Sequence, residues 1–121
     1  MRVGYVVLYV TNAQECLAFW TERVGMVEKG RKQAGEFAIV QVGFEDQQFA
    51  LEIVPLALMG ENPDGLDLAT PSMAFHVANL TETRDTLMAA GVQVTEINQH
   101  SGVEAFAFSD NENRWFAVTG G

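Results

Sequence analysis

VTNAQE, at residues 10–15, has the pattern V-x-N-x-x-E and returns 67 residues later as VANLTE at residues 77–82. Asparagine is a favoured N-cap, and a glutamate three residues later can bond back to the cap, so each copy predicts a helix start. Each copy follows an apolar run and precedes a helix-like stretch that stops at Gly25 or Gly91. Glycine tolerates the left-handed backbone past a last helical turn. The sequence therefore predicts strand, capped helix and glycine stop twice over.

Strand patterns follow each predicted helix and complete a β-α-β-β-β unit in each half. The predicted strands are 5–10, 26–31, 37–44 and 48–54 in the first half, and 73–77, 92–97, 103–109 and 115–119 in the second. We expect one α+β domain, 1–121, built from two paired modules, about 1–54 and 71–121, with a linker at 55–70. The modules are expected to form a curved mixed sheet around a cavity, with the helices on the outside.

The bulk composition excludes several classes of protein. At 121 residues the chain has room for one domain with a core. Seven Lys and Arg against sixteen Asp and Glu give a net charge of −9, which disfavours nucleic acid and anionic membrane surfaces as partners. No apolar run approaches the roughly 20 residues of a membrane span, and no signal peptide is apparent. The single cysteine, Cys16, excludes an internal disulfide and suits a cytoplasmic location.

Alternation along each predicted strand separates an apolar face from a mixed one. The first helix offers Leu17, Trp20 and Val24 for packing on the apolar face. The mixed face has no helix to cover it, and a concave surface of this kind is the usual form of a small-molecule site. The candidate ligand-binding residues on it are Tyr5, Tyr9, Glu52, Ser72, His76 and Trp115.

Each candidate has a structural alternative. Glu52 is either a charge facing the cavity or an edge carboxylate in water. His76 is either a proton donor to the ligand or a core histidine bonded to a backbone carbonyl. Tyr5, Tyr9 and Trp115 form either an aromatic wall for a flat or cationic ligand or plain core between the modules.

Two segments carry a resemblance to a known family. FWTERVGM at residues 19–26 is similar to an FY-x-x-x-LGF segment, and FSDNEN at 108–113, with the strand after it, is similar to an F-x-D-P-D-G-N turn. Together with the repeat they resemble the vicinal oxygen chelate superfamily over nearly the whole chain. That superfamily includes glyoxalase I, extradiol dioxygenases, fosfomycin resistance proteins and bleomycin-binding proteins.

The resemblance implies where a divalent metal would be held in the enzymes of the family. The corresponding positions here are Tyr5, Glu52, Ser72 and Ala117. Only Glu52 is a good ligand for such a metal, because a phenol, a hydroxyl and a methyl do not make a divalent site. We therefore expect no metal and no other cofactor. What the resemblance then implies is the bleomycin-binding branch, whose members are homodimers that sequester a cationic drug.

The sequence thus favours a metal-independent small-molecule binding protein, of drug-sequestering type, with an aromatic or cationic ligand. Two alternatives stay open. One is a lyase or isomerase of glyoxalase type with a metal held by Glu52, His76 and His100. The other is a dimeric interaction module that uses its linker, including Leu56 to Met59, and has no ligand.

Overall fold

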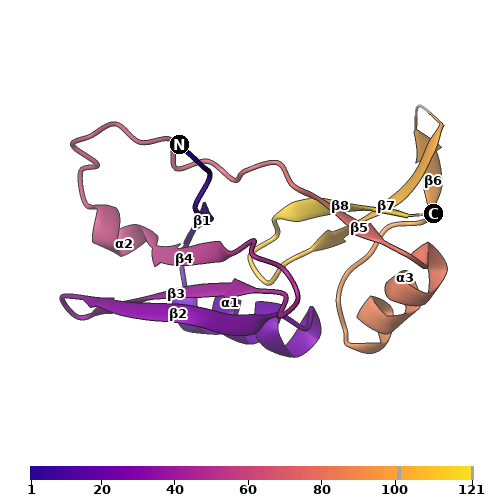
Figure 1. Cartoon of the computed structure of the whole chain (residues 1–121), viewed down its shortest axis with the longest axis horizontal. Helices are drawn as coiled ribbons and strands as arrows, with labels where there is room; N and C mark the ends of the chain where they lie inside the picture. Colours follow the sequence, from indigo (N-terminus) through magenta and orange to yellow (C-terminus); the bar gives the residue numbers. More distant parts are fainter. Residues whose placement is uncertain (101, 121) are drawn as a thin grey trace. The chain divides into compact units, whose positions relative to one another are not determined.

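The computed structural model describes residues 1–100 and 102–120 and divides the chain into two compact units (Figure 1). Unit 1 is Met1–Pro71 and unit 2 is Ser72–Gly121. Each unit contains one four-stranded mixed sheet and the helix of one β-α-β-β-β module. The α+β class with two such modules is therefore confirmed.

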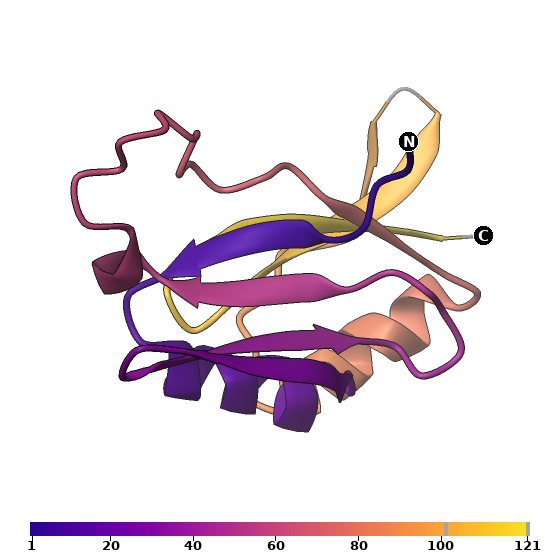
Figure 2. The same ribbon diagram turned by 60° about the vertical axis from the view of Figure 1, so that its left-hand side comes forward.

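Unit 1 contains a sheet whose strands lie in the order β1-β4-β3-β2, which can be followed in Figure 2. The outer strand β1 pairs with β4 in parallel, and the other two pairings are antiparallel. A short helix, α2, follows β4 within the segment predicted to be a linker. The elements are β1 (Val6–Val10), α1 (Ala13–Ala18), a π-helical turn (Phe19–Arg23), β2 (Val27–Ala34), β3 (Phe37–Gly43), β4 (Leu51–Pro55) and α2 (Leu56–Met59).

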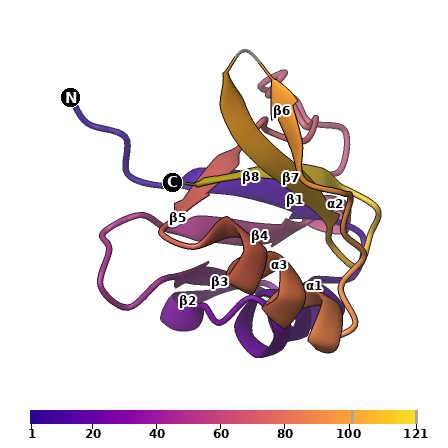
Figure 3. The ribbon, with the colours of Figure 1, turned by 90° about the vertical axis from the view of Figure 1, so that its right-hand side faces the viewer.

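Unit 2 repeats this topology, with the strand order β5-β8-β7-β6 and a parallel β5–β8 pair. Figure 3 turns this unit toward the viewer, with α3 below the hairpin of β6 and β7. The elements are β5 (Ala74–Val77), α3 (Leu80–Ala89), β6 (Asn98–His100), β7 (Val103–Ser109) and β8 (Trp115–Gly120).

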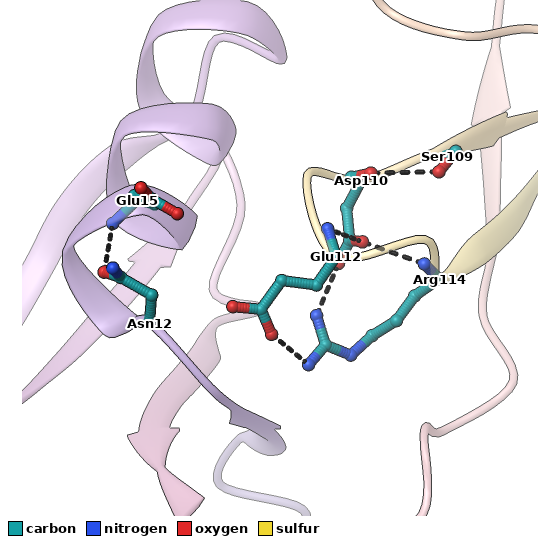
Figure 4. A network of polar contacts seen from close by, with 6 residues as sticks. All are labelled: Asn12, Glu15, Ser109, Asp110, Glu112 and Arg114. Carbon is teal, nitrogen blue, oxygen red and sulfur yellow. Dashed lines mark hydrogen bonds and ion pairs between the residues drawn. The ribbon is translucent and has the colours of Figure 1, made fainter.

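The caps predicted from the repeat are present in both units. Asn12 Oδ1 accepts the Glu15 backbone N–H at 3.0 Å, as Figure 4 shows, and Asn79 Oδ1 accepts that of Glu82 at the same distance. These bonds satisfy helical donors that have no partner inside the helix. The glycine stop predicted after α1 is also observed, since Gly25 has φ +94°.

The end of the first helix departs from regular α geometry. Val24 N–H donates to Phe19 O, five residues back, and this turn is π-helical. Phe19 and Trp20 are buried, whereas Leu17 and Val24 are only half-buried. Trp20 packs in the core as predicted.

The two apolar sheet faces form the cores of their units. In unit 1 the face is aliphatic, and α1 contacts β4 on this sheet. Its fully buried strand residues are Leu8, Val10, Val42, Leu51 and Ile53. In unit 2 the face is aromatic, with Phe75, Phe108 and Phe116 at centroid separations of 5.7–6.4 Å. Burying one such side chain contributes about 1.5–3 kcal/mol.

The strand predicted at 92–97 is wrong. Only Val94 makes a bridge there, to Phe108, and the strand β6 begins at Asn98. At Thr95, hydrogen bonds from side chains replace those of a regular strand ladder. The Thr95 hydroxyl accepts the Ala107 N–H at 2.8 Å, and the Thr95 carbonyl accepts from Arg84 Nε at 2.7 Å. Threonine side chains compete with the backbone in this way.

None of the helices in the described part of the chain has the length and apolar character needed to cross a lipid bilayer.

The Asn79 cap can be tested by substitution. Asn79→Ala should lower the free energy of unfolding by about 1 kcal/mol, because the Glu82 N–H loses its acceptor. Asn79→Asp keeps an acceptor oxygen and should retain most of the stability. Urea denaturation of both variants measures the difference. Equal losses from the two substitutions would contradict a role for the cap.

Candidate ligand-binding site

Strand register brings one polar pair into the middle of the unit 1 sheet. Glu52 in β4 is paired with Val7 of β1 on one side and with Gln41 of β3 on the other. Gln41 is in turn paired with Gly30 of β2. Directly paired residues share a sheet face. Glu52 therefore lies on the face opposite Ile53, as the alternation predicted.

Glu52 is a buried carboxylate with few partners. Only 5% of its surface is exposed. Its Oε2 accepts a hydrogen bond from Gln41 Nε2 at 2.9 Å and lies 3.8 Å from Lys32 Nζ. Within residues 1–100 and 102–120, no hydrogen bond or ion pair is made by its Oε1. A carboxylate offers about four acceptor positions, so most of its bonding capacity is unused.

The ion pair with Lys32 is loose. The Lys32 side chain is 60% exposed, and 3.8 Å is too long for a hydrogen bond. Pairs with such an exposed partner contribute about 0–1 kcal/mol. Lys32 therefore neutralises Glu52 without holding it firmly.

A hollow of about 140 Å³ opens beside this carboxylate. Its lining residues are Gly30, Arg31, Lys32, Ile39, Gln41 and Glu52. Gly30 borders the hollow beside Gln41, since a Cβ at that position would make ordinary van der Waals contact with Gln41 Oε1 at 3.5 Å. Gln41 donates its amide N–H to Glu52, so its Oε1 is left as an acceptor on the Gly30 side. The hollow thus presents a carboxylate and an amide oxygen.

The corresponding row of unit 2 is made of alanines. Val7 and Ala74 occupy the same place in the two repeats, 67 residues apart. Val7 is paired with Glu52, and Ala74 is paired with Ala117. Ala117 is paired further with Ala107, where Glu52 is paired with Gln41. The predicted correspondence of Glu52 with Ala117 is thereby observed, and unit 2 forms its sheet with alanine in the places of Glu52 and Gln41.

The other candidates of unit 1 lie near the same face. Tyr9 is half-buried and is paired with Val54, on the face of Glu52. Tyr5 precedes β1 and is 42% exposed. Tyr9 thus shares the sheet face of Glu52, one pair of residues further along the same face, whereas Tyr5 is exposed.

The candidates of unit 2 are exposed. Ser72 precedes β5, and His76 lies within it with Nδ1 3.3 Å from Thr119 Oγ1. Trp115, at the start of β8, is 48% exposed. The side chain of His100 lies outside the described part of the chain. Of the candidate ligand-binding residues, Glu52 is the one that lines the hollow beside β2 and β3. The roles of the unit 2 residues stay predictions.

The turn before Trp115 is rigidly bonded. Asp110 is buried, and its Oδ1 accepts the backbone N–H groups of Glu112 and Arg114, both at 2.9 Å (Figure 4). Its Oδ2 accepts from Arg114 at 2.9 Å, and the same guanidinium contacts Glu112 at 2.7 Å. Burial lowers the pKa of Arg114, but these hydrogen bonds outweigh it and raise the pKa above its ordinary value. This network fixes the start of β8 and with it Trp115.

Five residues of the hollow were missed by sequence reasoning, namely Gly30, Arg31, Lys32, Ile39 and Gln41. Gln41 carried a usable signal, because it is the only polar residue in the strand FAIVQVG. Lys32 lies in a strand rich in charged residues, where nothing distinguishes it.

The positions that correspond to family metal ligands do not fit a divalent cation. They hold one carboxylate, Glu52, which contacts Gln41 and Lys32, and a phenol, a hydroxyl and a methyl. Throughout the described residues, no three His, Cys, Asp or Glu side chains lie together as metal ligands would.

The chain matches the family model described as Glyoxalase/Bleomycin resistance protein/Dioxygenase superfamily over residues 2–118. No curated protein sequence matches it. Among solved structures, it is similar to TnmS3, an antibiotic binding protein from Streptomyces sp. CB03234, with a TM-score of 0.81, 15% identity, and coverage of 99% of this chain and 95% of that one.

Two further structures give similar values. UcmS2 has a TM-score of 0.79 and 21% identity, covering 98% of this chain and 97% of that one. A superfamily member from Sphaerobacter thermophilus DSM 20745 has a TM-score of 0.80 and 18% identity, with coverage of 100% and 98%. At these identities the likeness establishes a shared fold.

The Asp110 network predicts a strong dependence on Arg114. Arg114→Met should lower the free energy of unfolding by about 2–3 kcal/mol, because it leaves a buried carboxylate without its counter-charge. Arg31→Met, which breaks the exposed pair with Glu28 at 2.7 Å, is the matched control and should change stability little. Chemical denaturation compares the two, and similar effects would refute the proposed role of burial.

Proposed function

We propose that this chain, which belongs to the glyoxalase/bleomycin resistance protein/dioxygenase superfamily, is a metal-independent binding protein that sequesters a cationic compound with an aromatic group. The observation that carries the proposal is the buried Glu52, which lines a hollow of about 140 Å³ and whose Oε1 has no bonding partner among the described residues. A homodimer in the cytoplasm is part of the proposal and rests on the family likeness and the single cysteine.

The free-energy cost of burying the Glu52 carboxylate supports a function for this residue. Burying a carboxylate is unfavourable unless it is fully paired and hydrogen-bonded. The alanine row of unit 2 supports the view that the sheet has no structural need of this group. A costly group that the fold does not require is expected at a binding site.

Of the two cationic residues that line the hollow, Arg31 is paired with Glu28 at 2.7 Å and Lys32 is the loose partner of Glu52. The size of the hollow and the net charge of the protein favour part of a cationic ligand. Small-molecule pockets usually measure about 300–1,000 Å³, so 140 Å³ suits the charged end of a ligand and not the whole of it. The net charge of −9 draws cations toward the protein. Tyr9, half-buried on the same face, offers a ring for an aromatic group. The antibiotic binding described for the structurally similar TnmS3 supports a drug-like ligand.

Replacing the Glu52 carboxylate should separate the contribution of the ligand's charge to its affinity from the contribution of its shape. Benzylammonium and neutral benzyl alcohol have nearly the same shape, and two-dimensional NMR titration measures the affinity of each. Glu52→Gln should weaken benzylammonium binding at least about tenfold, because hydrogen bonds to a charged group contribute about 1.5–3 kcal/mol. Benzyl alcohol should bind the variant and the parent alike.

Gly30→Val provides the matched control for shape. Its side chain fills the hollow and leaves Glu52 unchanged, so both probes should lose affinity. Unchanged binding of benzylammonium in either variant would refute the proposed site.

Metal independence has a separate test. The protein purified without chelators should contain less than stoichiometric divalent metal by elemental analysis, and EDTA should not alter its affinity for benzylammonium. A stoichiometric metal whose removal abolishes binding would instead favour a lyase or isomerase of glyoxalase type.

A further inference from the structure

We propose that Lys32 is a tethered competitor that occupies the Glu52 carboxylate in the ligand-free protein, and that the ligand displacing it carries a primary ammonium group. This inference rests on the proposed function and specifies the chemistry of that same site. Its starting point is that a primary ammonium from the chain itself already lies 3.8 Å from Glu52 Oε2.

The geometry makes Lys32 easy to displace. Its side chain is 60% exposed and its ammonium stays beyond hydrogen-bonding distance of the carboxylate. A long, flexible lysine stem can leave for water at little cost. A ligand ammonium in the hollow can approach Glu52 to about 2.8 Å and form the charge-assisted hydrogen bond that Lys32 does not make.

The acceptors around the hollow match three N–H donors. Glu52 contributes Oε1 and Oε2, and Gln41 contributes Oε1 on the Gly30 side. A primary ammonium has three N–H groups to direct at these oxygens. A quaternary ammonium has no donor, and it is usually recognised by aromatic cages; the lining of the hollow contains no aromatic side chain among the described residues.

Lys29 offers a matched control on the same strand. It carries the same charge as Lys32, but its ammonium donates to the Gln47 carbonyl and not to Glu52. Lys29→Gln and Lys32→Gln therefore change the net charge equally, and only the second removes the competitor.

The experiment is an NMR titration of the parent, Lys32→Gln and Lys29→Gln with benzylammonium, benzyltrimethylammonium and benzyl alcohol. The side-chain NH₂ signals of Gln41 report on occupancy of the hollow. Lys32→Gln should bind benzylammonium about two- to fivefold more tightly, the range expected when a weak exposed ion pair no longer competes. Lys29→Gln should match the parent, and benzyl alcohol should bind all three alike.

The outcomes separate this inference from the function on which it rests. If benzylammonium binds the parent more tightly than Glu52→Gln, but Lys32→Gln brings no gain, the site stands and the competitor role is wrong. Equal affinity for benzyltrimethylammonium would overturn the primary ammonium class. If no probe binds any of the proteins, both the proposed function and the inference fall. Lys32→Met, which keeps the stem and removes the charge, must reproduce the gain of Lys32→Gln.

Discussion

The parallel pairing of β1 with β4 is the constraint on which the rest of unit 1 depends. It places Val7 beside Glu52 and Leu8 beside Ile53. Side chains alternate along a strand, so a slip of one residue would move the carboxylate into the helix-packed core and Ile53 out of it. The free energy of burying the aliphatic face therefore also holds Glu52 in its place at the hollow. Core packing and site geometry are set by a single register.

Short-range sequence patterns predict much of this arrangement. Asn12 and Asn79 predict the helix starts because capping is a local interaction. The alternation of Leu51, Glu52 and Ile53 predicts which side chain faces away from the helix, since the period of two is a property of the strand itself. These local rules are enough to give the repeated module and the residue on which the candidate site is centred.

The remainder depends on interactions that no single segment specifies. Lys32 and Gln41 reach Glu52 through the pairing of three strands, and that register is fixed by tertiary packing. The early strand predicted in the second half failed because the Thr95 hydroxyl and Arg84 occupy groups that a regular ladder would use. The π-helical turn at Phe19–Arg23 is likewise a feature that the helical spacing of apolar residues did not predict.

The alanine row of unit 2 bears on how such a protein can change its specificity. Ala74, Ala117 and Ala107 show that these positions accept small neutral side chains while the opposite face keeps its phenylalanine core. Selection or design is thus able to alter the chemistry of one sheet face without repacking the other. Duplication gave this chain two frameworks of the same build, and in unit 2 the places that correspond to Glu52 and Gln41 hold only alanine, so a second recognition chemistry can be introduced there.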